Sequence, residues 1–358
     1  MYTQTEMILN RICVSAAEKK VSEIYLINAQ IPFINLDGKI QPLSGENILA
    51  ASFISDVISA VLDNKEQSEL QEKKQIITVK EIGKLGSVQI HVYYQKNTPA
   101  ICLKLLSQEA LDQEKIELPK MVQDFTNLSK GIVFVAGPHD SGRFSLVTSL
   151  IDNINKNQNK YIATLEKPIK YNLTGVKSII EQREVGRDVL SFKEGLNFIR
   201  ERGHVDVVMI SQIKNAETME ELFALAEAGT LIFAIMDTGS SIQTIKRILH
   251  FFPTSEEENI RYFLSENLAG IIATRLVPKI GGGRVRALEV LSAPPSIRTI
   301  IAEGKLHQLS TFLQTGEDTK SVSMDRYLAD LVTSSKISLE DAIKNCVDEE
   351  MLKSLLRR

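Results

Sequence analysis

The stretch GIVFVAGPHDSGRFSLVTSL, residues 131–150, decides the fold of the larger part of this chain. Its first six residues are apolar without a break, which is typical of a strand buried on both faces of a sheet. Two glycines, Gly137 and Gly142, follow the strand. Beyond them apolar side chains recur at the spacing of a helix face: Phe144, Val147, Leu150, Ile151 and Ile154. The stretch therefore predicts a strand at 131–136, a glycine loop and a helix at 142–155.

Similar apolar runs recur downstream and alternate with segments of helical period. They predict further strands at 161–166, 205–211 and 229–237. This alternation favours an α/β fold with a mostly parallel sheet covered by helices. We place this domain at 130–291. Residues 292–358 are helical and polar in pattern, with Ser338 as an N-cap, and predict a helical subdomain.

The first 108 residues predict a smaller α+β domain. The unit is expected to begin with a helix; strands are expected at 22–27, at 32–40 with a turn at Asp37-Gly38, and at 75–82, 87–95 and 100–107, with a further helix at 46–62. The polar stretch at 108–120 is typical of a linker, and we place the linker at 109–129. Two or three domains agree with a length of 358 residues.

Composition limits the function classes. The chain has 42 basic and 45 acidic residues, a net charge of -3, so no broad basic surface for nucleic acid is expected. The three cysteines, Cys13, Cys102 and Cys346, have no spacing typical of zinc ligands and indicate thiols in a reducing compartment. No metal site is predicted from ligand spacing. The N-terminus has no secretory leader pattern, and we expect a cytoplasmic protein.

The glycine loop has the outline of a phosphate-binding P-loop but not its full chemistry. A P-loop reads G-x-x-x-x-G-K-[ST], in which the lysine reaches the outer phosphates and the hydroxyl binds magnesium. Gly137 and Gly142 have this spacing, whereas Arg143 stands at the lysine position and Phe144 at the hydroxyl position. From these residues alone, a purely structural strand-to-helix turn and a phosphate site both remain open.

The second half of the chain resembles a known family. The segments GIVFVAGPHDSGRFSLVTSLIDNINKN, IATLEKPIKY, QREVGRDVLSF, GGGRVRALEVLSAPPSIRTIIAEGKLHQLSTFLQTG and MDRYLADLV are similar, in order and spacing, to type IV pilus retraction ATPases of the PilT family. The N-terminal VSEIYLINAQIPFINLDGKI is similar to that family's PAS-like domain. The resemblance implies a PAS-like domain, a RecA-like ATPase domain and a ring hexamer with nucleotide between subunits.

The resemblance implies a nucleotide-binding role for the loop positions, which here are Gly137, Ser141, Gly142, Arg143, Phe144 and Ser145. Asp140 stands where the family has glycine. Its charge beside a triphosphate would cost roughly 1 kcal/mol at about 4 Å in water, and about 4 kcal/mol at an effective dielectric of about 20. Phe144 offers magnesium no ligand. The Ser145 hydroxyl lies one position out of phase, about 100 degrees round the helix.

The family's catalytic positions give a divided result. Glu166 matches the glutamate that polarises the attacking water, but Lys167 and Lys170 stand where acidic residues are usual. A nearby lysine would lower the pKa of Glu166 and weaken it as a base. Gln212 replaces a glutamate that helps to organise magnesium. Thr230 and Asp237 stand at positions where the family has histidines.

Other matches lie outside the phosphate site. Arg183 and Arg187, and Arg200 or Arg202, correspond to arginines that the family donates across subunit boundaries, although solvated surface arginines are the alternative. The segment SIRTIIAEGKLHQ resembles the family's retraction motif. We expect its exposed candidates for transmitting movement to be Arg298, Glu303 and Lys305.

Three functions follow from these observations. The first is a degenerate retraction ATPase that joins or regulates a homomeric or mixed ring, contacts the pilus inner-membrane platform protein and binds Mg-ATP weakly or not at all. The second is a slow but active ATPase, in which Arg143 and Glu166 suffice and Asp206 holds magnesium. The third is an interaction scaffold unrelated to pili.

Overall fold

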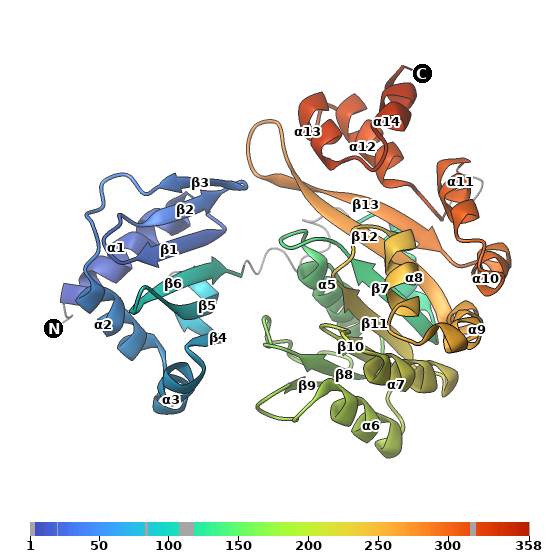
Figure 1. Ribbon diagram of the computed structural model, residues 1–358, viewed down its shortest axis with the longest axis horizontal. Coiled ribbons are helices and arrows are strands. Elements are labelled where there is room, and N and C mark those ends of the chain that lie inside the picture. Colours follow the sequence, from blue (N-terminus) through green and yellow to red (C-terminus); the bar gives the residue numbers. More distant parts are fainter. Residues whose placement is uncertain (1–3, 20, 83–84, 107–117, 316–319, 358) are drawn as a thin grey trace. The chain divides into compact units, whose positions relative to one another are not determined.

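The computed structural model describes residues 4–19, 21–82, 85–106, 118–315 and 320–357 (Figure 1). The chain divides into two compact units. The first comprises Met1–Gln108 with Pro168–Asn172, and the second comprises Glu109–Lys167 with Leu173–Arg358. Each unit has its own sheet and its own buried core, so the expected fold class, α+β followed by α/β, is confirmed.

The first unit is an antiparallel sheet with helices. Its strand order is β3-β2-β1-β6-β5-β4. The strands are β1 (Glu23–Ile27), β2 (Phe33–Leu36), β3 (Lys39–Pro42), β4 (Gln75–Ile82), β5 (Gly86–Gln95) and β6 (Thr98–Leu105), and the helices are α1 (Gln4–Glu18), α2 (Ala51–Val61) and α3 (Asn64–Lys73). The alternate strand residues Ile24, Leu26, Ile90 and Leu103 join Ile54 and Val57 of α2 in its core.

Two elements of this unit differ from the prediction. The helix expected at 46–62 begins at Ala51, because Leu49 is extended and exchanges backbone hydrogen bonds with the chain at Ala29 and Gln30. Helix α3 was not predicted. Its sequence signal is a capping box, in which Asp63 accepts from the backbone N–H of Glu66 and Glu66 accepts from that of Asp63.

The second unit has a seven-stranded sheet in the order β13-β12-β7-β11-β10-β8-β9. All neighbours are parallel except the hairpin of β12 and β13. The strands are β7 (Gly131–Ala136), β8 (Tyr161–Glu166), β9 (Ile179–Glu184), β10 (Val207–Ile210), β11 (Leu231–Met236), β12 (Leu268–Pro278) and β13 (Arg284–Ser292). The mostly parallel sheet is confirmed. Three of its strands, β9, β12 and β13, carry charged or polar residues within their runs and were not predicted.

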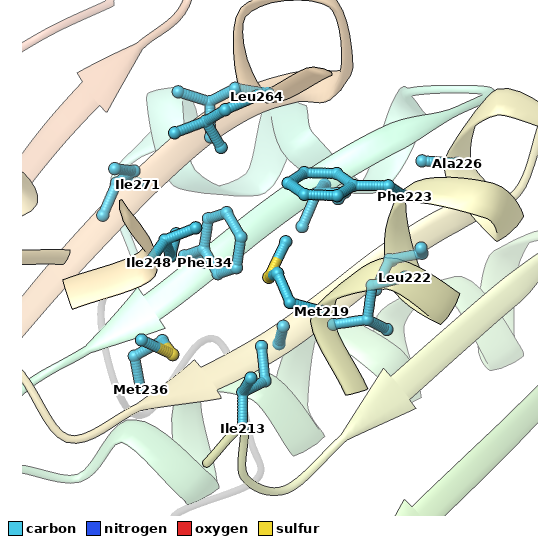
Figure 2. Close-up of a cluster of buried hydrophobic side chains, with 14 of the residues drawn as sticks. Phe134, Ile213, Met219, Leu222, Phe223, Ala226, Met236, Ile248, Leu264 and Ile271 are labelled. Carbon is cyan, nitrogen blue, oxygen red and sulfur yellow. The ribbon is translucent and has the colours of Figure 1, made fainter. Parts of the chain in front are cut away.

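Helices cover both faces of this sheet. On one face α5 (Arg143–Asn157) packs its apolar stripe against alternate residues of the central strands, such as Val133, Val135 and Phe233. The opposite face is covered by α6 (Phe192–Arg202), α7 (Ala216–Glu227), α8 (Ser241–Leu249) and α9 (Glu257–Asn267). Figure 2 shows this second core, in which Phe134 of β7 lies close to Met219 of α7 and Ile248 of α8.

The second unit extends beyond the sheet at both ends of its sequence. Of the predicted linker at 109–129, residues 109–117 lie outside the described residues, whereas Leu118, Val122 and Phe125 are buried in the core under α5. This part contains α4 (Lys120–Gln123) and a short 3-10 helix, η3 (Asp124–Asn127). The C-terminal helices are α10 (Pro295–Ala302), α11 (His307–Thr315), α12 (Met324–Thr333), α13 (Leu339–Asn345) and α14 (Glu349–Leu356). A domain boundary at 292 stays a prediction.

The parallel strands place their carboxyl ends at one edge of the sheet. Gly137 follows β7, Glu166 ends β8, Gln212 lies beyond β10 and Asp237 follows β11. In open α/β sheets ligands bind at this edge. Across the described residues, no helix combines the length and the apolar character that crossing a membrane requires.

Candidate functional site

The glycine loop between β7 and α5 is held tightly by its own chain. A Cβ atom on Gly137 would lie 2.2 Å from Ser141 Oγ and 2.6 Å from the carbonyl oxygen of Thr274, so only glycine fits there. Thr274 of β12 also donates its hydroxyl to the carbonyl of Ser141, at 3.2 Å. Gly142 has a φ of 79° and forms the N-cap of α5. The strand, glycine loop and helix expected from the sequence are therefore present.

Arg143 is turned back onto the ends of the strands. Its Nη1 donates to the carbonyl oxygens of Gly137 at 2.6 Å and Met236 at 2.9 Å, and it also forms an ion pair with Asp237. Since Met236 is the register partner of Ala136, the guanidinium bridges two adjacent strands at their carboxyl ends. The positive charge that a P-loop directs at phosphate is here bound to the protein's own acceptors.

The next two positions also face inward. Phe144 packs against the core under α5, so an apolar ring fills the place where a P-loop has its metal-binding hydroxyl. The Ser145 hydroxyl donates to the carbonyl of Gly142 at 3.0 Å. Arg286 of β13 lies behind the loop and is only 9% exposed; it donates to the Gly142 carbonyl at 2.8 Å and to Ser145 Oγ at 3.4 Å. We call loop 137–142 with these side chains and Asp237 the phosphate side.

Glu166 lies at the end of β8 and is 2% exposed. Its Oε1 accepts from the Thr164 hydroxyl at 2.6 Å and from Nε2 of Gln182 at 2.9 Å. We call these three residues the base side. Lys167, predicted to alter the field at Glu166, has an exposed side chain, and its backbone N–H donates to Ser211 Oγ at 3.1 Å. Thr164 and Gln182, the donors of these two hydrogen bonds, are both neutral.

The remaining candidates of this edge are less constrained. Gln212 is half-buried and lies just beyond Ser211, which follows the end of β10 at Ile210. Asp140 is exposed and has a φ of 59°. Its charge is therefore screened by solvent, and the water value of roughly 1 kcal/mol applies rather than the larger one.

Asp206, Thr230 and Arg200 lie at the opposite, amino edge of the sheet, where the parallel strands begin. Asp206 and Thr230 directly precede β10 and β11, and β10 rises about 13 Å over its length. A cavity of about 400 Å³ is lined by Arg200, Asp206 and Thr230 among others. The expectation that Asp206 could hold magnesium at the loop is therefore wrong, because it belongs to the other edge. Thr230 likewise contributes nothing to the loop; its hydroxyl donates to the Val205 carbonyl.

Asp206 has local partners that account for its charge. Burial raises the pKa of its carboxyl group. Hydrogen bonds from the Tyr161 backbone and from the Lys160 ammonium together outweigh this effect, so the net shift of the pKa is downward. These contacts measure 2.9 Å and 3.0 Å. The side chain stabilises the start of β10.

The predicted trans arginines make contacts within their own chain. Arg183 of β9 stacks on the ring of Phe198 at 4.9 Å, and its Nη2 donates to the Asp188 carbonyl at 3.4 Å. Because side chains alternate along a strand, Arg183 faces α6, whereas its neighbour Gln182 faces Glu166. Figure 1 shows β9 at the end of the sheet, so this strand is an edge strand.

The other arginines surround α6 and the turn after β9. Arg200 pairs with Glu221 of α7 at 2.9 Å, and Arg202 pairs with Glu181 at 2.7 Å. Arg187 pairs with Glu184 at 3.1 Å. Arg200 lies at the amino edge, so it does not reach the loop of its own chain, and a role at a nucleotide would require another subunit.

The predicted motor-coupling residues separate into two kinds. Arg298 is half-buried, and its guanidinium donates to the carbonyls of Ala293 and Glu266, each at 2.9 Å. It therefore ties α10 to the end of α9, and the expectation that it is an exposed contact is wrong. Glu303 and Lys305 are about half exposed and form an ion pair at 2.7 Å.

Two features of the site were missed in the sequence. Arg286 contacts the loop from a strand that was not predicted; its signal was a charged residue inside the run RVRALEVL. Asp237 was noted only as the replacement of a histidine, whereas it is the partner of Arg143. The sequence showed the two charges, Arg143 at the lysine position and Asp237 at the end of a later predicted strand, but their contact depends on β11 lying beside β7.

Comparison with known proteins identifies the family. Residues 4–308 match the family described as type II/IV secretion system protein. The chain belongs to this family. Its relatives in the family include the type IV pilus retractation ATPase PilT of Pseudomonas aeruginosa, 28% identical over 341 residues that cover 94% of this chain and 97% of that protein. The type IV pilus ATPase PilU of the same organism is 27% identical over 342 residues, covering 95% and 89%.

Comparison with solved structures agrees with the fold. A crystal structure of the pilus retraction motor PilT with bound ADP has a TM-score of 0.83 and 33% identity, covering 99% of this chain and 100% of that one. The ATPase DotB of Legionella pneumophila has a TM-score of 0.81 at 19% identity and shares the fold. The resemblance inferred from the sequence motifs is confirmed.

The family implies ATP and magnesium, but the residues at this loop do not fit them. Arg143 is bound to Asp237 and two carbonyls, Phe144 is half-buried against the core, and the Ser145 hydroxyl donates to a backbone carbonyl. No group at the hydroxyl position could ligate magnesium. We therefore derive no hydrolytic step for this chain.

Proposed function

We propose that this chain is a subunit or regulator of a type IV pilus retraction motor and that its own nucleotide site is disabled. Similarity to PilT and PilU over nearly the whole chain supports the motor role. The observation that carries the second part is the contact set of Arg143, whose guanidinium is bound to Asp237 and to the ends of β7 and β11. Phosphoryl transfer depends on free cationic groups that position and neutralise phosphates.

In this proposal the chain acts through its surfaces. It joins a ring, homomeric or mixed with active relatives, at the cytoplasmic base of the pilus, where it meets the inner-membrane platform protein. Arg183 and Arg200 are its candidates for reaching a neighbour's nucleotide, and Glu303 with Lys305 its exposed candidates for transmitting movement. A subunit with an inactive pocket changes which neighbours hydrolyse ATP.

One observation favours the second candidate, a slow ATPase. Glu166 is retained at the carboxyl edge of the sheet that also carries a strand, glycine loop and helix arranged as in a P-loop. Such an enzyme would have to release Arg143 from Asp237 and hold magnesium without Asp206.

Binding and turnover of Mg-ATP by the purified full chain decide between the two. The proposal predicts no binding at millimolar Mg-ATP, no phosphate release, and co-assembly with an active retraction ATPase measured by oligomer mass. Steady phosphate release that is abolished by Glu166→Gln would establish the slow enzyme. Failure to co-assemble would instead favour the scaffold unrelated to pili.

A restoring variant tests why the site is disabled. We expect Asp140→Gly, Arg143→Lys, Phe144→Ser and Gln212→Glu together to raise ATP affinity only weakly, because the introduced lysine still faces Asp237. Adding Asp237→Asn removes that competitor, and we expect at least a tenfold further gain. Equal affinity with and without the fifth change would refute the role given to Asp237.

A further inference from the structure

The loop that follows Asp237 is held by an arginine of β12. Arg275 is half-buried, and its Nη2 donates to the carbonyl oxygen of Gly239 at 3.4 Å. Its Nη1 donates to the carbonyl oxygen of Asn345 and, at 3.3 Å, to that of Cys346, where α13 ends. One guanidinium therefore joins the loop after β11 to the C-terminal helices.

A second side chain fixes the same C-terminal segment, residues 345–348, which we call the C-terminal turn. The Asp325 carboxylate of α12 is buried and accepts from the backbone N–H groups of Val347 at 2.6 Å and Asp348 at 3.2 Å. The turn thus gives carbonyls to Arg275 and N–H groups to Asp325. Because these backbone groups have partners on both β12 and α12, the position of the turn is closely determined.

The loop at the other end of this link leads directly to the phosphate side. The N–H of Gly239 donates to Oε1 of Gln243 in α8 at 3.0 Å, and a Cβ atom on Gly239 would lie 3.0 Å from that oxygen. Gly239 is therefore packed closely against α8. Because only Thr238 separates Gly239 from Asp237, a displacement at Gly239 moves the acid that pairs with Arg143.

Two adjacent residues of β12 contact the two segments of the phosphate side. Thr274 donates to the Ser141 carbonyl, and Arg275 faces the opposite way because side chains alternate along a strand. Glu289 shares the face of Arg275, since it is two positions from Ala287, the register partner of Arg275. Burial raises the pKa of Glu289, and the charge of Arg275 acts in the opposite direction. Arg275 is thus within electrostatic reach of the carboxylate that accepts from the first residue of α8.

The contacts of the two guanidinium nitrogens are unequal. A guanidinium is planar and rigid, so its nitrogens keep a fixed spacing. Nη1 donates to two carbonyls of the C-terminal turn, whereas the contact of Nη2 with Gly239 is longer than a typical N–H···O hydrogen bond. The turn therefore determines where the guanidinium lies, and the Gly239 contact is the one that breaks when the turn moves.

We infer that Arg275 is a latch through which the C-terminal helices control the loop that follows Asp237. With the C-terminal turn in place, Gly239 is held and Asp237 stays on Arg143. A displacement of α13 and α14 withdraws the guanidinium from Gly239 and releases the loop. The phosphate side is thus regulated from the C-terminal helices, and the inference does not depend on the proposed function, because the latch acts with or without nucleotide.

Hydrogen exchange of the full chain, followed by mass spectrometry, tests the latch. Asp325→Ala removes an acceptor of the C-terminal turn and none of the hydrogen bonds of Gly239. We expect faster exchange in the turn and roughly threefold faster exchange in the peptide that covers residues 238–241, because a weak hydrogen bond that supports this loop is lost. Thermal unfolding confirms that the variant is folded; if it is not, Asp325→Asn, which keeps one acceptor oxygen, takes its place.

The same change in an Arg275→Gln background shows whether the effect passes through the arginine. Arg275→Gln alone should speed exchange in residues 238–241, and adding Asp325→Ala should produce no further rise there. Asp325 also acts on Glu289, whose pKa it raises. An effect transmitted by that charge would persist without the arginine, and a further rise in the double variant would therefore overturn the inference.

Arg261→Gln provides the matched control. Arg261 of α9 is also half-buried and also donates to a backbone carbonyl, that of Ala302 at 3.3 Å. Its loss should leave exchange unchanged in residues 238–241 and in the C-terminal turn. Unchanged exchange of residues 238–241 in Asp325→Ala, or an equal rise in the Arg261 control, would also contradict the latch; none of these results bears on ATP turnover.

Discussion

The base side, on β8 and β9, and the phosphate side, which follows β7 and β11, belong to one sheet with β10 between them, yet their charged groups have different partners. The base side retains Glu166, buried and held by two neutral donors, Thr164 and Gln182. On the phosphate side, Arg143 is paired with Asp237 and carbonyls, and Arg286 supports the loop from behind. The carboxylate of the base side accepts from neutral donors, whereas the arginines of the phosphate side donate to a carboxylate and carbonyls of their own chain.

This difference separates two reasons for keeping a residue. Glu166 has structural contacts that would hold it in place even without catalysis, because its removal leaves buried donors without an acceptor. On the phosphate side, Arg143 needs no nucleotide to satisfy its charge, since its acceptors are Asp237 and two carbonyls of the same chain. Retention of Glu166 is thus compatible with loss of turnover.

The largest expected effect comes from the base side. Glu166→Ala should lower the free energy of unfolding by about 2–3 kcal/mol, because Thr164 Oγ1 and Gln182 Nε2 lose their buried acceptor. Glu166→Gln keeps an acceptor oxygen and should cost less than half as much. Urea denaturation measures both; a negligible cost for Glu166→Ala would break the structural account of this residue.

A smaller effect is expected on the phosphate side from Gly142→Ala. The φ of 79° disfavours a side chain by about 1–2 kcal/mol, and the new Cβ would lie 2.8 Å from Arg286 Nη1. Gly229, whose φ is 100° and whose Cβ would meet no atom within 4 Å, offers the matched control, since Gly229→Ala carries the backbone cost alone. Equal losses of unfolding free energy in the two variants would show that Arg286 does not constrain the loop.

The pair of Arg143 and Asp237 should show modest coupling. A double-mutant cycle of Arg143→Gln and Asp237→Asn is expected to give about 0.5–1 kcal/mol, because the Asp237 side chain is 62% exposed and the pair is screened. Thermal unfolding of the four proteins at low and high salt measures it. Coupling that is zero at low salt would mean that Asp237 does not hold Arg143.

The last effect depends on pH and concerns the helix that follows Asp237. Burial raises the pKa of Glu289, whose carboxylate accepts from the Ser241 backbone at 2.7 Å and so fixes the start of α8. The folded state therefore binds this proton more tightly than the unfolded state, and stability falls as pH rises from the ordinary glutamate range through the raised pKa. Glu289→Gln should remove this slope, gaining stability relative to the native chain at neutral pH and none in acid. Unfolding at several pH values tests it; a parallel slope in the variant would contradict it.

Much of the second unit could be predicted because its central strands are continuous apolar runs. The strand at 131–136 is as expected, and the helix beyond Gly142 begins one residue later than predicted, as Gly142 is its N-cap. The edge strands β9 and β13 could not be predicted in the same way, because one or both faces carry polar residues such as Arg183 and Arg286. Their order in the sheet depends on pairing between distant segments.

The candidate site shows the same limit. The substitutions at Arg143 and Phe144 were visible as departures from a P-loop, but their consequence was not. That Arg143 pairs with Asp237 depends on β7 and β11 being adjacent, and the sequence does not state this adjacency. The prediction that Asp206 holds magnesium failed for a different reason. Asp206 is next to β10 in the sequence, but it precedes that strand and therefore lies at the amino edge, away from the glycine loop.

The most direct test of the central claim is calorimetric titration of the unmodified full chain with Mg-ATP, with phosphate release measured in parallel. The account predicts no heat of binding at millimolar nucleotide and no turnover above buffer. Micromolar binding of Mg-ATP, accompanied by phosphate release that stops with Glu166→Gln, would contradict it.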